Sequence, residues 1–228
     1  ALGHLWIKDL KSGAAPRRLT RQTEDFEFYP SWSRDGRSVV YTTWNDQTFG
    51  TVRVVGAGGG EGRVVTAQPG HYLDPAFSPD GERVAFRSSR QGAGLFVMGR
   101  TGDFVRRVSD AGYSPAWSPD GAQIAYSTVL VTDFVYSYAG GSALWVVNVA
   151  NGERRQLTTL DAVQPAWSPS GRWIAFWGVD PRTRQRDLWT VSATGGQPIR
   201  LTDDVAVDAT PAWAPNGDYL YFSSNRGG

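Results

Sequence analysis

Apolar positions along this chain fall in short runs of about four to six residues, separated by polar turns rich in glycine, proline, serine and aspartate. β-Branched and aromatic residues dominate the runs, as is typical of strands that are half buried in a sheet. The pattern therefore predicts many short β-strands and no long helices. The clearest runs are SVVYTT at 38–43, RVAFRSS at 83–89, QIAYST at 123–128, WIAFWG at 173–178 and YLYFSS at 219–224.

A proline motif precedes each of these runs and recurs about every 40–50 residues. The five copies are PSWSRDG from Pro30, PAFSPDG from Pro75, PAWSPDG from Pro115, PAWSPSG from Pro165 and PAWAPNG from Pro211. The end of the motif predicts a tight hairpin, because proline presets φ, aspartate bonds the backbone ahead and glycine takes the left-handed position. The aromatic residue at the third position is expected in the core between repeats; it is Trp32, Phe77, Trp117, Trp167 and Trp213.

Two further apolar runs complete each repeat. The third runs lie at 5–7, 52–55, 95–97, 144–146 and 188–191, and the fourth are RRLT at 17–20, RVVT at 63–66, RRVS at 106–109, RQLT at 155–158 and IRLT at 199–202. Four short strands in a repeat of this length are typical of one propeller blade. We therefore predict an all-β fold, a five-bladed β-propeller of four-stranded antiparallel blades.

The two ends of the chain complement each other. The last repeat stops after two strands, whereas residues 1–29 supply a third and a fourth strand with no first or second before them. Pairing the two ends would cover both exposed strand edges, so a composite blade is predicted to close the ring. The whole chain, 1–228, is then one domain and a monomer, with blades at 30–74, 75–114, 115–164, 165–210, and 211–228 plus 1–29.

The PAWSPDG motif, followed by IAF, LW-V and RRLT, resembles the TolB-like, WD40-like PD40 repeat family along essentially the whole chain. The resemblance implies a periplasmic or extracytoplasmic propeller that binds a protein or peptide. Similar propellers also accompany amidohydrolases, prolyl peptidases and kinases. Residues 1–89 look more like propellers that precede amidohydrolases, and residues 113–228 more like propellers of membrane-anchored sensors or kinases. Drift or recombination would explain this difference between the two parts. The chain departs from the family in having five repeats rather than six, and at Arg34, Ser170, Ala214 and Asn216.

Composition narrows the choice of partners. The net charge of +1 gives no electrostatic reason to bind nucleic acid, and no apolar stretch reaches the length that spans a bilayer. Cysteine is absent, which excludes disulfides and thiolate chemistry. Because the chain starts without methionine, we expect a mature form, an excised domain or an engineered chain. Nearly all basic residues are arginine, which we interpret as codon or stability bias rather than an arginine-rich binding face.

No catalytic constellation is visible. The two histidines, His4 and His71, fall in different repeats, and no hydrolase, zinc or phosphate-binding motif occurs. The glycine-rich segment at 55–62 is expected to be a hairpin turn. Recurrence of Asp35, Asp80 and Asp120 in successive turns indicates a structural role rather than acid–base chemistry. We therefore predict a chain that is not an enzyme and needs no cofactor.

Acidic residues that are expected to precede the first strands raise the question of a metal. A rim of Asp74, Asp161, Asp203, Asp204 and Asp208 would offer oxygen ligands to a divalent cation. Solvated loop charge is the favoured interpretation, and no metal is predicted.

Recognition is expected on the face that carries the variable loops. The predicted partner-binding residues of one loop are Phe134, Tyr136 and Tyr138; the alternative is that this loop plugs the ring or packs locally. Those of a second loop are Arg182, Arg184 and Arg186, which would meet an acidic partner or else be solvated. The residues before the repeat prolines are expected around the channel mouth: Tyr29, Asp74, Ser114, Gln164 and Thr210. The sequence thus favours a non-catalytic protein- or peptide-binding module. The alternatives are a substrate-gating propeller from a hydrolase or sensor protein, and an engineered or recombined scaffold without a function of its own.

Overall fold

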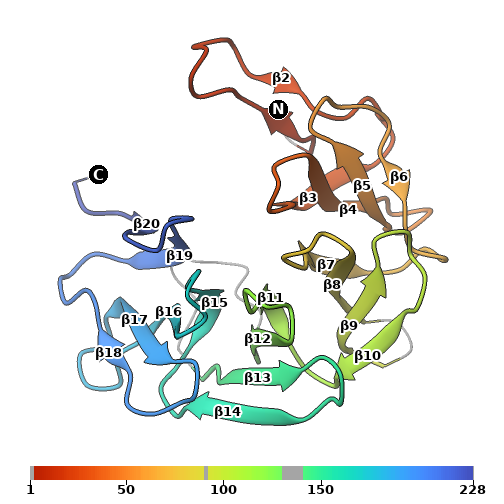
Figure 1. The fold of residues 1–228 in the computed structure, drawn as a ribbon. Coiled ribbons are helices and arrows are strands. Elements are labelled where there is room, and N and C mark those ends of the chain that lie inside the picture. The colour runs from red at the N-terminus through yellow and green to blue at the C-terminus, as the bar shows by residue number, and fades with distance from the viewer. Residues whose placement is uncertain (1–2, 90–91, 130–140, 228) are drawn as a thin grey trace. The chain divides into compact units, whose positions relative to one another are not determined.

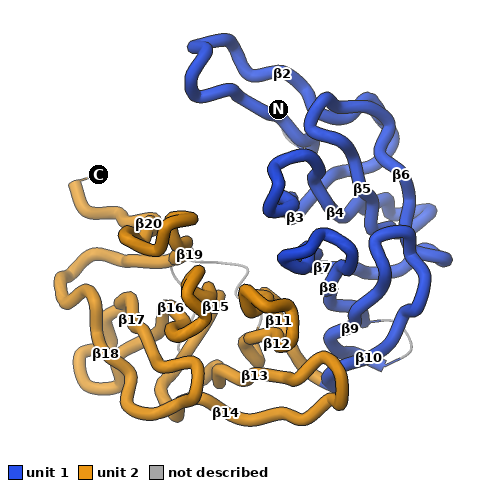
Figure 2. The backbone as a smooth tube through the Cα atoms, in the orientation of Figure 1, with its two compact units in different colours: residues 1–110 blue, residues 111–228 orange. Residues whose placement is uncertain are grey.

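The computed structural model describes residues 3–89, 92–129 and 141–227 of the 228-residue chain. Within these ranges every regular element is a β-strand, and no helix occurs that could cross a membrane. The chain forms two compact units, residues 1–110 and 111–228 (Figure 2). Each unit is built from antiparallel sheets of sequentially ordered strands (Figure 1).

Unit 1 contains one short hairpin and two four-stranded sheets. The hairpin pairs β1 (Trp6–Ile7) with β2 (Arg17–Arg18). The first sheet consists of β3 (Phe26–Trp32), β4 (Ser38–Trp44), β5 (Val52–Gly56) and β6 (Arg63–Val64). The second consists of β7 (Tyr72–Phe77), β8 (Arg83–Ser88), β9 (Gly94–Gly99) and β10 (Arg106–Ser109).

Unit 2 contains two four-stranded sheets and one strand pair. The first sheet consists of β11 (Tyr113–Trp117), β12 (Gln123–Ser127), β13 (Leu144–Asn148) and β14 (Arg154–Thr158). The second consists of β15 (Val163–Trp167), β16 (Trp173–Val179), β17 (Arg186–Ser192) and β18 (Ile199–Arg200). The pair is β19 (Asp208–Trp213) with β20 (Leu220–Ser224).

The all-β class and the four-stranded antiparallel blades are confirmed. Four complete blades begin at β3, β7, β11 and β15, and β1–β2 and β19–β20 are separate two-stranded sheets. The composite blade and the count of five stay predictions.

Each first strand begins two to four residues before its repeat proline, at Phe26, Tyr72, Tyr113, Val163 and Asp208. The expectation that Asp74 and Asp208 precede these strands was therefore wrong, since both lie inside them. The strand runs through the proline because a β-bulge takes up one extra residue: Leu73 faces Arg87 and Ala76 faces Ala85, so two residues oppose one. The same shift recurs in the other four first strands.

Side chains between neighbouring sheets make the core. In unit 1, β3 and β4 pack against β7, and in unit 2, β15 packs against β11 and β12. The predicted core aromatics Phe77 and Trp117 are buried, and Trp167 and Trp213 are half-buried. Trp32 is 49% exposed, so its prediction was wrong. Within unit 1, only the short β1–β2 hairpin precedes β3.

In unit 1, the first arginine of the RRLT-type motif ties one repeat to the next. Arg63 donates to the carbonyl oxygens of Arg100 and Thr101, at 3.0 and 3.3 Å. Arg17 does the same at Ala57 and Gly58. A guanidinium fork can reach two neighbouring carbonyls at once, which a lysine ammonium does less well. The arginine bias of the composition therefore has a structural use, in keeping with the stability interpretation.

Candidate binding surfaces at the loop ends of the blades

The five residues before the repeat prolines share one unusual backbone conformation. Their φ angles are 51° at Tyr29, 49° at Asp74, 50° at Ser114, 49° at Gln164 and 53° at Thr210. Side chains other than glycine avoid this left-handed region, and each such residue costs about 1–3 kcal/mol. The β-bulge of each first strand enforces this conformation, so the predicted channel-mouth residues form a structurally equivalent set.

Several of these side chains also have structural partners. Gln164 accepts a hydrogen bond from the buried Trp177 Nε1 at 2.8 Å, and Thr210 bonds Ser223. Burial, together with the nearby charge of Asp74, raises the pKa of Tyr29. Gln164 and Thr210 therefore each bond a side chain of the neighbouring second strand, β16 or β20. The location of the five residues around a channel mouth stays a prediction.

The predicted arginine loop joins β16 to β17 through a turn that Asp180 organises. Oδ1 of Asp180 accepts the backbone N–H of Arg182 at 2.7 Å and that of Thr183 at 3.4 Å. The Arg184 N–H donates to the Asp180 carbonyl at 2.8 Å, and Arg184 has a φ of 62°. The N–H of Arg182 is the main reason that the pKa of Asp180 lies below its ordinary value. The loop is therefore fixed by its own backbone, and the Arg182 side chain projects from it, 84% exposed.

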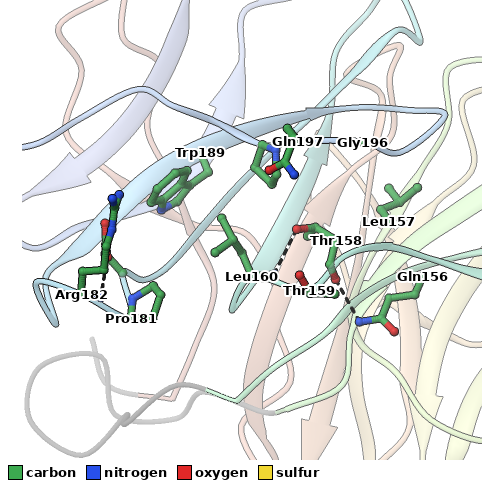
Figure 3. Close-up of a pocket in the computed structure, with 12 residues that line it drawn as sticks. Gln156, Leu157, Thr158, Thr159, Leu160, Pro181, Arg182, Trp189, Gly196 and Gln197 are labelled. Atoms are coloured by element: carbon green, nitrogen blue, oxygen red, sulfur yellow. Dashed lines mark hydrogen bonds and ion pairs between the residues drawn. The ribbon is translucent and has the colours of Figure 1, made fainter.

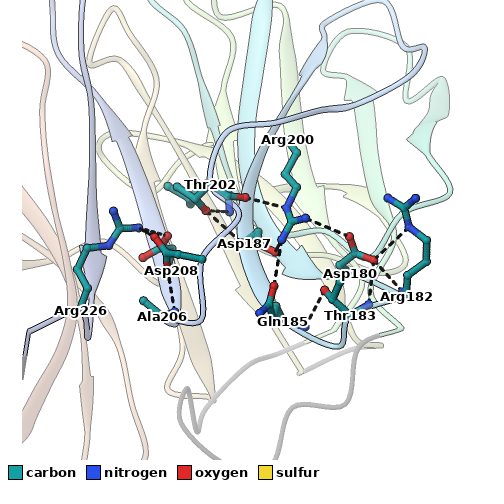
Figure 4. A network of polar contacts seen from close by, with 12 residues as sticks. Asp180, Arg182, Thr183, Gln185, Asp187, Arg200, Thr202, Ala206, Asp208 and Arg226 are labelled. Carbon is teal, nitrogen blue, oxygen red and sulfur yellow. Dashed lines mark hydrogen bonds and ion pairs between the residues drawn. The ribbon is translucent and has the colours of Figure 1, made fainter.

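Arg200 reaches two buried carboxylates beside this loop (Figure 4). Its Nη2 is 2.6 Å from Oδ2 of Asp187, and its Nη1 is 3.8 Å from Oδ2 of Asp180. Both aspartate side chains are at most 1% exposed. Burial raises the pKa of Asp187, and the Arg200 guanidinium opposes that shift. Arg200 thus neutralises two buried acids and connects the loop to β17 and β18.

An open groove of about 550 Å³ adjoins this loop in unit 2. Its lining includes Arg182, the amides of Gln156 and Gln197, and the apolar side chains of Leu160 and Trp189. In Figure 3, Arg182 lies at one end of these residues and Gln156 at the other. Gly196, Gln197 and Pro198 line the groove and belong to no strand. They precede β18, which has only two residues, whereas the corresponding fourth strand of the preceding blade, β14, has five. The groove thus offers one cation, which also pairs with the lining residue Asp180 at 3.7 Å, two amides and apolar walls.

The other predicted partner-binding residues have different outcomes. Arg184 lies in the same loop as Arg182, and Arg186 is the first residue of β17, but neither lines the described groove. Phe134, Tyr136 and Tyr138 lie outside the described residues. Of the predicted partner-binding residues that the structure describes, Arg182 is the one that lines the groove.

The acids of unit 2 that were considered for a cation have other partners. Asp161 accepts backbone N–H groups of Ser142 and Val179, each at 2.8 Å. Asp204 and Asp208 both pair with Arg226, at 2.7 and 2.6 Å. Across the described ranges, no three His, Cys, Asp or Glu side chains come together as a metal site.

The turn aspartates act as predicted for a structural role. The Ser33, Ser78 and Ser118 hydroxyls donate to Asp35, Asp80 and Asp120 in turn. Each aspartate also accepts a backbone N–H two residues ahead. The serine hydrogen bond is the largest reason that the pKa of each carboxyl lies below 3.8.

A cluster of aromatic side chains in unit 1 was missed at the sequence level. Trp44 contacts Phe49 and His71 edge to face, with ring centroids 5.9 and 5.4 Å apart. Phe26 faces Trp44 across the β3–β4 pair. The available signal was the segment from Trp44 to Gly50, which has the same turn chemistry as the arginine loop.

Comparison with known sequences identifies the family. The profile of the PD40 family, described as the TolB beta propeller domain, matches residues 4–129 and again residues 103–228. The chain belongs to this family. Its repeats, blades and bulges are thus those of a TolB-type propeller.

Related proteins agree with this assignment. The Tol-Pal system protein TolB of Francisella tularensis is 27% identical over 219 residues, covering 92% of this chain and 48% of that protein. The chain therefore spans about half the length of the curated relatives it matches. A peptidase of Bacillus subtilis, YuxL, is 29% identical over 163 residues, covering 67% of this chain and 22% of the peptidase.

Solved structures show the same fold. TolB from Acinetobacter baumannii matches with a TM-score of 0.70 and 21% identity, over 92% of this chain and 51% of that one. A structure assigned as TolB from Agrobacterium tumefaciens matches with a TM-score of 0.75 and 24% identity, over 92% and 73% of the two chains.

Proposed function

We propose that the chain is a non-catalytic propeller module that binds a protein or peptide at the loop ends of its blades. The observation that carries the proposal is the groove beside the Asp180 turn, where the exposed Arg182 side chain stands on a rigid loop. A preorganised loop loses little conformational entropy when a partner binds. The relatives named as Tol-Pal system proteins belong to a multi-protein system, which supports a protein partner for this chain.

The proposed ligand of the groove is a peptide segment with a carboxylate. Arg182 supplies the cation, and its fork suits a carboxylate better than a lysine would. The two glutamine amides offer both donors and acceptors to a peptide backbone. The apolar walls give a place for a neighbouring aliphatic side chain.

Substitution of the exposed arginine tests this proposal. Peptides selected from a display library against the whole chain are measured for binding to the unaltered protein, to Arg182→Gln and to Arg172→Gln. Arg172 is a matched control because it is exposed in the same blade, on the turn at the opposite end of β16. We expect Arg182→Gln to weaken the selected acidic peptides by about tenfold and Arg172→Gln to leave them unchanged. Equal binding to all three proteins would contradict the groove as the binding site.

A second candidate is a substrate-gating propeller that belongs to a hydrolase. It is favoured by the match to the Bacillus subtilis peptidase. The same chain joined to a catalytic domain would then change the size range of peptides cleaved, whereas the binding module would leave it unaltered.

Deletion of the segment with Phe134, Tyr136 and Tyr138 tests the remaining predicted anchor, because unchanged partner binding would exclude it.

A further inference from the structure

The loop end of unit 1 presents aromatic rings instead of arginines. Phe26 is 56% exposed, Phe49 is 54% exposed and Phe28 is 42% exposed. Phe26 and Phe28 have ring centroids 6.5 Å apart, and Trp44 joins Phe49 to His71. We call Phe26, Phe28, Trp44, Phe49 and His71 the aromatic surface. Exposed aromatic groups on one surface are typical of interfaces.

The backbone holds Phe49 in place. The Phe49 N–H donates to the Asn45 carbonyl at 2.8 Å, and Asn45 Oδ1 accepts the N–H of Gln47 at 2.9 Å. Phe49 has a φ of 62°, which is unfavourable for a bulky side chain. The same turn, from Asp180 to Arg184, presents arginine in unit 2. One backbone design thus displays an aromatic ring in one unit and a cation in the other.

The next blade fixes the loop from the other side. Gly50 and Gly70 exchange two backbone hydrogen bonds, at 2.9 and 2.8 Å. A Cβ atom at Gly50 would lie 2.2 Å from the carbonyl oxygen of Thr43, so only glycine fits there. The strained Phe49 is therefore held by contacts with two blades. Strain that the surrounding structure maintains in this way is often found at binding sites.

The loops that carry the aromatic surface contain acidic residues but no lysine or arginine. Segments 23–29, 44–50 and 71–74 contain no lysine or arginine and five acids: Glu24, Asp25, Glu27, Asp46 and Asp74. Glu27 is buried against backbone and side-chain donors, and Asp25 pairs with Arg53 at 3.0 Å. Asp46 is exposed and accepts the Trp44 indole N–H at 2.7 Å. Carboxylates beside exposed rings favour a cation, because both the charge and the ring faces attract it.

We propose that the aromatic surface of unit 1 binds a basic, arginine- or lysine-containing segment of a partner protein. The inference rests on the proposed binding function and assigns the partner class of a second surface, with chemistry opposite to that of the Arg182 groove. A guanidinium or ammonium group stacks on the exposed Phe49 ring, and Asp46 in the same loop supplies the counter-charge.

A labelled peptide tests the proposal on the whole chain. The probe is a dye-labelled peptide of four Gly-Ser-Arg repeats, measured by fluorescence anisotropy. Its controls carry citrulline or glutamate in place of arginine. We expect the arginine peptide to bind at least about tenfold more tightly than the citrulline peptide, and to weaken as salt rises from about 50 to 300 mM. Equal binding of the arginine and citrulline peptides would overturn the proposal.

Matched variants locate the site. Phe49→Asn removes the ring while keeping a residue that tolerates positive φ, and Asp46→Asn removes the charge while keeping the oxygen that accepts the indole N–H. Phe104→Asn is the control for the ring, since Phe104 also has positive φ, at 50°, and is 87% exposed at the opposite end of its blade. Glu82→Gln controls for loss of an exposed acid. We expect a loss of about three- to tenfold for the first two variants and no change for the controls.

The outcomes separate this inference from the proposed function. If Phe104→Asn weakens the arginine peptide as much as Phe49→Asn does, the aromatic surface is not the site. If no arginine peptide binds while acidic peptides still require Arg182, the inference fails and the proposed function stands. Unchanged circular dichroism and melting temperature of each variant show that a loss of binding does not come from unfolding.

Discussion

Arg63 reaches out of its own blade, and its Nη2 donates a 3.0 Å hydrogen bond to the carbonyl oxygen of Arg100 in the next one. Its Nη1 donates to the adjacent carbonyl of Thr101. The contact joins the fourth strand of one repeat to the turn of the following repeat, so the blades are linked by a side chain that the repeat itself encodes.

Replacing this arginine should weaken the contact between blades. Arg63→Lys keeps the charge but loses the fork, and we expect the free energy of unfolding to fall by about 0.5–1 kcal/mol. Urea unfolding measures the change. Arg34→Lys is the control, because Arg34 is an exposed residue of the same unit with no side-chain bond found among the described residues. An equal loss in both variants would argue against a specific link.

The turn aspartates should make stability depend on pH. Because folding lowers the pKa of Asp80 and Asp120, their stabilisation is complete above the unfolded value near 3.8 and is lost as pH falls through the folded value. The double variant D80N/D120N should therefore melt lower than the unaltered chain at pH 7, and the difference should vanish in strong acid. Melting temperatures between about pH 2 and 7 test this sign. A difference in melting temperature that persisted in strong acid would contradict the prediction.

Arg200 should be essential to the second sheet of unit 2. Arg200→Met leaves Asp187 and Asp180 without their shared cation, and we expect a loss of about 3 kcal/mol in the free energy of unfolding. Adding Asp187→Asn to that variant should recover part of the loss, because the buried charge is removed. A double variant that is as unstable as the sum of the two single variants would exclude coupling between the residues.

Gln164 should matter for folding as well as for any ligand. Gln164→Met keeps the length of the side chain but leaves the Trp177 indole N–H without its acceptor, and Trp177 is fully buried. We expect a cost of about 1–3 kcal/mol, measured by chemical unfolding. The same change at the exposed Gln197 should be nearly neutral. If both substitutions are neutral, the hydrogen bond contributes little to stability.

Local chemistry explains what was predictable. The hairpins at Asp80 and Asp120 depend on residues within one turn, so their geometry was visible in the SPDG letters. The strands followed in the same way from short apolar runs rich in β-branched and aromatic residues. The arginine loop was identified as a recognition element, yet only Arg182 of its three arginines lines the groove.

Other features depend on neighbours far along the chain. Trp32 has the same motif as Trp117, but its exposure depends on which sheet covers it. The aromatic surface was missed because Trp44 and His71 are brought together by the packing of two blades.

The sequence by itself determined the all-β class, the repeated four-stranded blades and the tight turns, because these arise from interactions between residues close in the chain. The tertiary structure alone decided the left-handed residues before the prolines, the arginine links between blades, the neutralised acids around Arg200 and the two surfaces of opposite chemistry. These features require side chains from different strands and blades to meet, and burial and charge at such meetings depend on every neighbour at once.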